Sequence, residues 1–224
     1  GDVGKLDSWS INLLGDLAKN DTTYIFTDDW NTLGTDAARN TIEDVAGTDT
    51  LNFAAMTSSV NVDLTPSAVS SVGDLSMIID SQAKIENAIG GDGADTFSGN
   101  AENNVLRGMR GNDRLEGQAG DDQLIGGAGN DVLLGGYGVD TAVYSGAKAN
   151  YAVLTQASGT TIVFDKTGLD GIDEVTGVEQ LVFADQTVVL GTVGEVSGTT
   201  GNDGDLRGSS GGDIIKGLEG NDTI

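Results

Sequence analysis

Between residues 90 and 143 the chain repeats a nine-residue unit six times: GGDGADTFS (90–98), GNAENNVLR (99–107), GMRGNDRLE (108–116), GQAGDDQLI (117–125), GGAGNDVLL (126–134) and GGYGVDTAV (135–143). Each unit combines a glycine-rich turn, an acidic or amide residue in sixth position and a short apolar strand. One inward apolar residue per unit is too little to bury alone, so the units must stack to build a core. These inward residues are Phe97, Leu106, Leu115, Leu124, Leu133 and Ala142.

The turns carry residue types suited to a hard cation. Glycine lets the backbone adopt positive φ and direct its carbonyls inward, and Ca²⁺ takes six to eight oxygens at roughly 2.3–2.6 Å. One turn supplies about half of that shell, so an ion would join two stacked turns. If successive units alternate between the two edges of a flattened roll, the sixth-position residues pair as Asp95 with Asp113, Asp113 with Asp131, Asn104 with Asp122, and Asp122 with Asp140.

A flexible, solvated linker is the alternative interpretation of such Gly/Asp-rich sequence. The register argues against it, because all six units keep the turn glycine, the acid or amide and the apolar residue at fixed positions.

The nonapeptide resembles the RTX, or hemolysin-type, calcium-binding repeat. This resemblance implies an all-β fold, with a parallel β-roll (a calcium-bound solenoid), flanking β-strands and a capping sheet. In that family an ion takes carbonyls from the second and fourth turn positions of one repeat and from the first and third positions of the later one. Both sixth-position side chains complete the shell.

Carried over residue by residue, the resemblance implies four sites, numbered here 1 to 4. Site 1 is Gly91, Gly93 and Asp95 with Gly108, Arg110 and Asp113; site 2 is Met109, Gly111 and Asp113 with Gly126, Ala128 and Asp131; site 3 is Asn100, Glu102 and Asn104 with Gly117, Ala119 and Asp122; site 4 is Gln118, Gly120 and Asp122 with Gly135, Tyr137 and Asp140. Site 3 departs from the pattern at Glu102 and Asn104, so we expect it to be the weakest.

The segments TIEDVAGTDTLNF (41–53) and SSVGDLSMIIDSQAKIENAIGGDGADTF (70–97) resemble the lead-in to the β-roll of serralysin-type secreted proteases. The implied calcium ligands there are Asp44, Ala46, Gly47 and Asp49, then the Lys84 carbonyl and Glu86. That family has threonine where Lys84 stands, and a nearby ammonium could weaken the site. From the residues alone, these acids read as ordinary solvated turn residues.

The composition restricts the partners. The 224 residues contain no cysteine and no histidine, and the formal net charge of −24 repels phosphate backbones and anionic lipid. We therefore expect no nucleic-acid partner, and no apolar run is long enough for membrane insertion. Calcium ions are the expected partner and cofactor, with folding coupled to their binding because crowded carboxylates repel until an ion intervenes.

The predicted segments are 1–20, 21–89, 90–143, 144–197 and 198–224. KLDSWSINLLG (5–15) resembles the last strand of the P domain in kexin-like subtilisin proteases, and 21–89 is the lead-in. Residues 144–197 form the capping sheet, with strands at 151–155, 161–165 and 178–190 joined by GLDGID and ADQ turns. A second array starts with GTTGNDGDLR (198–207), which has one extra residue, and we expect Asp203 and Asp222 to face each other across one site. The chain begins without a signal peptide and ends within a repeat, so we expect a fragment.

The absence of histidine excludes Ser-His-Asp and HExxH chemistry. A glycosidase-type carboxylate pair remains open, although calcium already accounts for acids at turn positions. Two functions follow. The first is a non-catalytic module for calcium-dependent folding after type I secretion, C-terminal to the catalytic domain of an extracellular protease, of the subtilisin-like serine type. The second is the calcium-stiffened stalk of an RTX adhesin or surface-binding protein.

Overall fold

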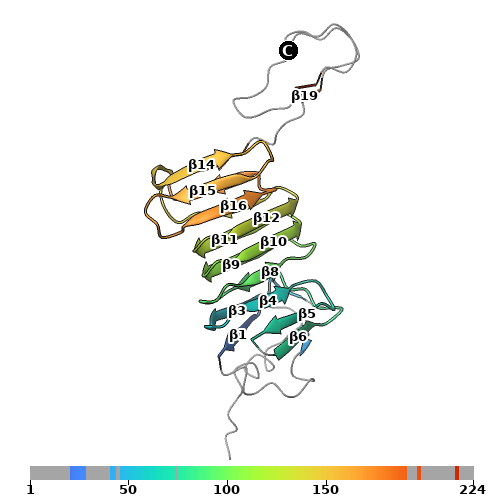
Figure 1. Cartoon of the computed structure of the whole chain (residues 1–224). Helices are drawn as coiled ribbons and strands as arrows, with labels where there is room; N and C mark the ends of the chain where they lie inside the picture. The colour runs from blue at the N-terminus through green and yellow to red at the C-terminus, as the bar shows by residue number, and fades with distance from the viewer. Residues whose placement is uncertain are drawn as a thin grey trace, which may run out of the picture.

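The computed structural model describes residues 21–28, 41–43, 46–73 and 75–190, together with two short strands at 196–197 and 215–216. This part of the chain is built of β-strands, with one 3-10 turn (η2, Lys148–Asn150). No helix in it has the length and apolar character that a membrane span requires. Figure 1 shows the strands lying across a long axis, stacked from β1 at one end to β14 at the other.

The strands form two long sheets. Sheet 1 contains, in spatial order, β1 (Thr23–Thr27), β3 (Thr50–Ala55), β7 (Asn87–Ile89), β9 (Val105–Arg110), β11 (Gln123–Ala128), β13 (Thr141–Val143), β17 (Gln180–Val182) and β18 (Thr187–Val189). Sheet 2 contains β14 (Tyr151–Thr155), β15 (Thr161–Asp165), β16 (Ile172–Thr176), β12 (Val132–Tyr137), β10 (Arg114–Ala119), β8 (Thr96–Ser98), β4 (Val60–Asp63), β5 (Val69–Val72), β6 (Leu75–Ile79) and β2 (Thr41–Ile42).

The repeats alternate between the two sheets, as the nine-residue period predicts. In sheet 2, Phe97 pairs with Leu115 and Leu115 with Leu133, all in parallel strands. In sheet 1, Leu106 pairs with Leu124 in the same way. Each strand therefore stacks on its second neighbour in sequence, and the predicted inward residues are all fully buried. The all-β fold and the parallel β-roll are confirmed.

The turns from residue 108 onward share one backbone pattern, in which the second and fourth positions have positive φ. Glycine occupies most of these positions, but Met109 (φ 84°) and Gln118 (φ 78°) do not have that freedom. A non-glycine residue in this region costs roughly 1–2 kcal/mol. Turns 90–94 and 99–103 lack the pattern even though Gly91 and Gly93 are glycines. The roll therefore contains two kinds of turn.

Aromatic clusters lie at the two ends of the roll. Near the start, the rings of Phe26 and Phe53 stack with centroids 4.5 Å apart, and Phe97 follows at 6.2 Å from Phe53. Near the other end, Tyr144 lies 5.4 Å from Phe183 and 5.2 Å from Tyr151. The inward residues between these clusters, from Leu106 to Leu133, are leucines. Aromatic packing is therefore confined to the two ends of the roll, and leucines alone fill the core between them.

The chain leaves the roll after β13 and returns to it. Strands β14 and β15 form an antiparallel hairpin, and β15 also pairs antiparallel with β16. Strand β16 then runs parallel to β12, and β17 runs parallel to β13. The predicted strands at 151–155 and 161–165 are present, whereas the predicted strand at 178–190 is the hairpin β17–β18. Strand β16 includes the end of GLDGID, which the sequence predicted as a turn.

The segment boundaries stay a prediction, and residues 1–20 lie outside the described part of the chain. Of the second array, the structure describes the pairing of β19 (Val196–Ser197) with β20 (Ile215–Lys216). These strands are parallel, and Val196 faces Ile215. The two paired residues are one position further apart in the sequence than paired residues inside the roll. The extra residue of GTTGNDGDLR accounts for this difference.

Candidate metal centres

The sixth-position residues form a ladder of hydrogen bonds along each edge of the roll, named here the acid ladder. On one edge, the N–H of Asp95 donates to Asp113 Oδ1 at 2.8 Å, and the N–H of Asp113 donates to Asp131 Oδ1 at 2.8 Å. On the other edge, the N–H groups of Asn104 and Asp122 donate to Asp122 Oδ1 (2.7 Å) and Asp140 Oδ1 (2.9 Å). The four predicted side-chain pairs are therefore brought together.

In four members of the ladder, the second carboxylate oxygen accepts no hydrogen bond. Oδ2 of Asp113, Asp122, Asp131 and Asp140 is buried and has no hydrogen-bond partner, and these residues are at most 2% exposed. Asp95 differs, because its Oδ2 accepts the N–H of Gly91 at 2.8 Å. An unpaired buried carboxylate oxygen is costly, and a bound cation removes that cost. These four oxygens are therefore suited to act as metal ligands.

The first glycine of each turn leaves the space in which ligands meet. A Cβ on Gly108 would lie 2.1 Å from Asp113 Oδ2 and 2.7 Å from the Gly126 carbonyl, two predicted ligands of site 2. A Cβ on Gly117 would lie 2.2 Å from Asp122 Oδ2 and 2.6 Å from the carbonyl of Gly135, which belong to site 4. The predicted ligands thus converge next to a residue with no side chain, and the residues present fit a calcium ion.

The fourth-position carbonyls point at the turn stacked above. A Cβ on Gly129 would lie 1.6 Å from the Gly111 carbonyl, and one on Gly138 would lie 1.9 Å from the Gly120 carbonyl. The same relation holds between Gly111 and the Gly93 carbonyl (2.0 Å), and between Gly120 and the Glu102 carbonyl (2.5 Å). Since the turns come this close, an ion would be shared between them.

The second-position carbonyls divide the four predicted sites into two types. In sites 1 and 3 these carbonyls accept hydrogen bonds, Gly91 from the N–H of Arg110 and Asn100 from that of Ala119, both at 3.2 Å. In sites 2 and 4 the third-position carbonyls of the later turn accept instead, Ala128 from Gly111 and Tyr137 from Gly120, both at 3.0 Å. This difference in hydrogen bonding matches the backbone: the earlier turn of sites 1 and 3 lacks the positive-φ pattern, and the earlier turn of sites 2 and 4 has it. Sites 2 and 4, between regular turns, therefore match each other most closely.

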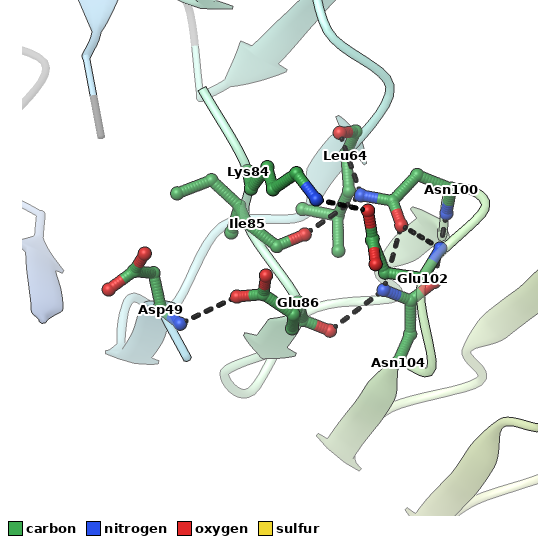
Figure 2. A network of polar contacts seen from close by, with 8 residues as sticks. All are labelled: Asp49, Leu64, Lys84, Ile85, Glu86, Asn100, Glu102 and Asn104. Atoms are coloured by element: carbon green, nitrogen blue, oxygen red, sulfur yellow. Dashed lines mark hydrogen bonds and ion pairs between the residues drawn. The ribbon is translucent and has the colours of Figure 1, made fainter. Parts of the chain in front are cut away.

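Figure 2 shows the second repeat, in which the amide of Asn104 stands where the other repeats carry aspartate. Asn104 Oδ1 accepts the N–H of Asn100 at 2.8 Å, and Asn104 Nδ2 donates to the Glu86 carbonyl at 3.0 Å. Asn100 Nδ2 donates to the carbonyls of Ile85 (2.9 Å) and Leu64 (3.2 Å). The Asn104 amide is thus satisfied by the protein itself, and the weakness of site 3 stays a prediction.

The lead-in residues extend the ladder beyond the repeats. The N–H of Asp49 donates to Glu86 Oε2 at 2.7 Å, and Asp49 Oδ1 accepts the N–H of Thr22 at 2.8 Å (Figure 2). The ammonium of Lys84 pairs with Glu102 Oε1 at 2.8 Å on the surface. Ala46 is half-buried, and Gly47 is exposed with φ 122°. The predicted ligands Asp44, Asp203 and Asp222 lie outside the described residues.

Two members of the acid ladder were missed in the sequence. Asp173 Oδ1 accepts the N–H of Asp131 at 2.9 Å, and Glu179 Oε2 accepts the N–H of Asp140 at 2.7 Å. The signal for Asp173 is the phrase GLDGID (168–173), with glycine in first and fourth place and an acid in sixth. Glu179 follows a shortened turn that carries no such signal.

Carbonyl oxygens must supply most ligands of any ion in this roll. In the described ranges, no three acidic side chains lie close enough together to hold a metal by themselves. Stacked turns therefore offer at most two side-chain ligands per ion, with backbone oxygens completing the six to eight that Ca²⁺ prefers.

Burial shifts the ladder carboxyls toward the protonated form when no metal is bound. It raises the pKa of Asp113 to about 7, and the negative charges of Asp131 and Asp95 add to the shift. It raises the pKa of Asp122 and of Asp131 to about 6, and the pKa values of Asp95 and Asp140 also rise. In each case a backbone N–H opposes the shift and is outweighed.

The metal-free roll should therefore be more stable in mild acid than at neutral pH. The pKa of Asp113 in the folded chain, about 7, lies above its ordinary value of 3.8, so folding takes up a proton. This stabilisation is complete below about pH 4 and is lost as the pH rises through about 7. In metal-free buffer, circular dichroism should show more β-structure at pH 5.5 than at pH 8. Asp113→Asn should weaken this dependence, and a β signal that grows with pH would contradict it.

The fold and the ladder define a class of protein, a parallel β-roll whose stacked turns bring buried carboxylates and backbone carbonyls together. The chain matches the family model of the RTX calcium-binding nonapeptide repeat over residues 89–124, 116–143 and 197–224. Such repeats imply that the chain binds Ca²⁺ at several places.

No curated protein matches the chain. Among solved structures it is similar to the extracellular lipase LipA from Serratia marcescens, with 23% sequence identity and a TM-score of 0.41. That similarity covers 58% of this chain and 24% of the lipase. The chain therefore spans about a quarter of that protein's length.

Proposed function

We propose that this chain is a non-catalytic module that binds several calcium ions and folds when it meets calcium outside the cell. The observation that carries the proposal is the set of four buried, unpartnered Oδ2 atoms in the acid ladder. Each belongs to a pair of turns whose carbonyls face each other, so an ion between the turns would neutralise charge and tie the turns together. The bound ion supplies positive charge and coordination, and the residues supply spacing and orientation.

The ligands are those of sites 1 to 4, with Asp49 and Glu86 as a further pair in the lead-in. Asp113 and Asp122 each belong to two of the sites, because each accepts from the turn before and donates to the turn after. Loss of one of these acids would disturb two neighbouring ions. In the intact roll, calcium binding at neighbouring sites would therefore be cooperative and not independent.

A secreted location suits this mechanism. Extracellular modules bind calcium at about 10⁻⁴–10⁻³ M, a range that is reached outside cells and not in bacterial cytosol. A chain that stays unfolded inside and folds outside would suit type I secretion machinery, which the RTX resemblance implies as a partner. The acidic surface, with a formal net charge of −24, supports a calcium partner over nucleic acid or membrane.

For the whole polypeptide, we extend the proposal to an extracellular protease of the subtilisin-like serine type, with its catalytic domain upstream of this module. The supports are the P-domain-like phrase at 5–15 and the serralysin-like lead-in. The second candidate is the calcium-stiffened stalk of an adhesin, which the elongated stack of strands favours (Figure 1). The N-terminal sequence of the intact polypeptide separates the two, since a catalytic domain there supports the protease.

The test of the module itself is a calcium titration of the 224-residue chain, followed by circular dichroism. We expect a cooperative rise in β-structure. Asp113→Asn should raise the calcium midpoint roughly tenfold or more, as the loss of a ligand-shell group does. Asp95→Asn is the matched control and should have a smaller effect, because Asp95 serves one predicted site and its Oδ2 already accepts from Gly91. Equal shifts would contradict the shared-ligand model.

A further inference from the structure

The solenoid resumes after the β14–β15 hairpin, outside the matched repeats. Strand β16 pairs with β12 so that Val132 faces Glu174 and Leu133 faces Val175, in parallel register. Val175 is buried, as the inward leucines of the repeats are. Residues 168–176 therefore occupy the place of the next repeat on this edge, although Asp173 is 42 residues from Asp131 and not 18.

The turn before β16 shares the fourth-position geometry of a repeat turn, although its positive φ values fall at the first and fourth positions, Gly168 and Gly171, and not at the second and fourth. Gly171 has φ 74°, and a Cβ there would lie 2.2 Å from the Gly129 carbonyl and 2.6 Å from Asn130 Oδ1. Gly129 stands in the same relation to the turn below it. The N–H of Ile172 donates to Asn130 Oδ1 at 2.9 Å, just as the N–H of Asn130 donates to the Asn112 side chain at 2.8 Å.

The acid ladder continues through this turn. The N–H of Asp131 donates to Asp173 Oδ1 at 2.9 Å, and the N–H of Glu174 donates to the Asp131 carbonyl at 2.8 Å. Oδ2 of Asp131 is buried and has no hydrogen-bond partner, and the residue is 1% exposed. Asp131 thus stands toward Asp173 as Asp113 stands toward Asp131 in site 2. An ion between the turns would be the missing partner of this oxygen.

The charges around this turn also favour a cation. Asp131 and Asp173 are both buried, at 1% and 2% exposure, and Asp170 stands in the same turn as Asp173. The Tyr151 hydroxyl donates to Asp170 Oδ2 at 2.5 Å. These carboxylates repel one another without an ion between the turns.

The turn is held in shape independently of any ion. The carboxylate of Asp165 accepts the N–H groups of Thr167, Leu169 and Asp170 at 2.8 to 3.0 Å. Burial alone would raise the pKa of Asp165, but these bonds and the Thr167 hydroxyl outweigh it and lower the pKa to about 2. Asp165 is thus ionised and occupied in ordering the backbone at 167–170. A preformed turn loses less conformational entropy when it binds a ligand.

We infer that turns 126–131 and 168–173 hold a further calcium ion. Its ligands are the carboxylates of Asp131 and Asp173 together with backbone carbonyls of the two turns, among them that of Gly129, which faces Gly171. This inference rests on the proposed function, since it extends the same stack by one ion. Its consequence is specific to this chain: the ion would fasten the returning strand β16, and with it the β14–β15 hairpin, to the roll.

The experiment counts calcium ions on the full chain by native mass spectrometry. Asp173→Asn should bind one ion fewer than the parent chain in saturating calcium. Glu174→Gln is the matched control, because it removes one carboxylate from the same strand at an exposed position, and it should leave the count unchanged. An equal count in the parent and in Asp173→Asn overturns the inference while the proposed function stands. A parent chain that binds no calcium overturns both.

A second measurement avoids the variant, in case Asp173→Asn does not fold. Crystals of the parent chain grown with calcium should show an anomalous scattering peak between Asp131 and Asp173. Peaks confined to sites 1 to 4 would overturn the inference without touching the proposed function. A peak coordinated by Asp131 and Asp173 supports it.

Discussion

Withdrawal of calcium at neutral pH should convert residues 90–143 from β-structure to mostly coil, and calcium but not magnesium should restore the fold. Each unsatisfied buried polar atom costs about 1–3 kcal/mol, and more when it is charged. Four such oxygens lie in the roll, on Asp113, Asp122, Asp131 and Asp140. Their combined cost approaches the roughly 5–15 kcal/mol of net stability of a whole domain. Circular dichroism and the hydrodynamic radius in chelator measure the change.

Magnesium is the control for this experiment. It requires near-ideal octahedral geometry at about 2.0–2.1 Å and keeps several of its waters, whereas a ligand set made of protein carbonyls and carboxylates suits the flexible shell of Ca²⁺. Refolding by magnesium at equal concentration would contradict the assignment to calcium. A spectrum that chelator leaves unchanged would show that the apolar core suffices.

A second large effect is expected at Gly129, where alanine should destabilise the calcium-loaded chain by roughly 2–4 kcal/mol through strain and overpacking. The new Cβ would lie 1.6 Å from the Gly111 carbonyl, and the backbone there has φ 142°. The turns at 108–113 and 126–131 would have to separate, which also moves the ligands of site 2. Urea unfolding in saturating calcium measures the loss.

Gly159→Ala is the matched control for Gly129→Ala. Gly159 also has positive φ, at 90°, but a Cβ there meets nothing within 4 Å. It lies in the turn between β14 and β15, so the variant carries the backbone penalty of about 1–2 kcal/mol without the clash. Similar losses at the two positions would show that conformational strain, and not the stacking of turns, sets the requirement for glycine.

The roll could be predicted from the sequence because its period is uninterrupted. Once successive nine-residue units alternate between the two edges, the period determines which strands stack, and Phe97 pairs with Leu115, 18 residues later. Asp173 was not predicted, because the repeat period is interrupted before it. The β14–β15 hairpin breaks the count before GLDGID, and leucine replaces the second glycine of the turn.

The two kinds of turn were also beyond sequence reasoning. Gly91 and Gly93 match the consensus as well as Gly127 and Gly129 do, yet they lack positive φ. The reason is the neighbour below, since a Cβ on Gly91 would meet the Met56 carbonyl and one on Gly93 would meet the N–H of Ser59. These residues belong to the loop between β3 and β4 and not to a repeat. A turn takes its shape partly from the turn on which it stacks.

The crosswise direction of the strands has a mechanical consequence. Because β1 and β18 lie at opposite ends of sheet 1, tension along the stack would load the hydrogen bonds of one turn at a time instead of shearing many together. Each pair of repeats released would lengthen the chain by about 60 Å. The aromatic clusters would then hold the two ends of the roll folded, while the calcium-bound middle extends. The resistance of the middle to extension would depend on the calcium concentration.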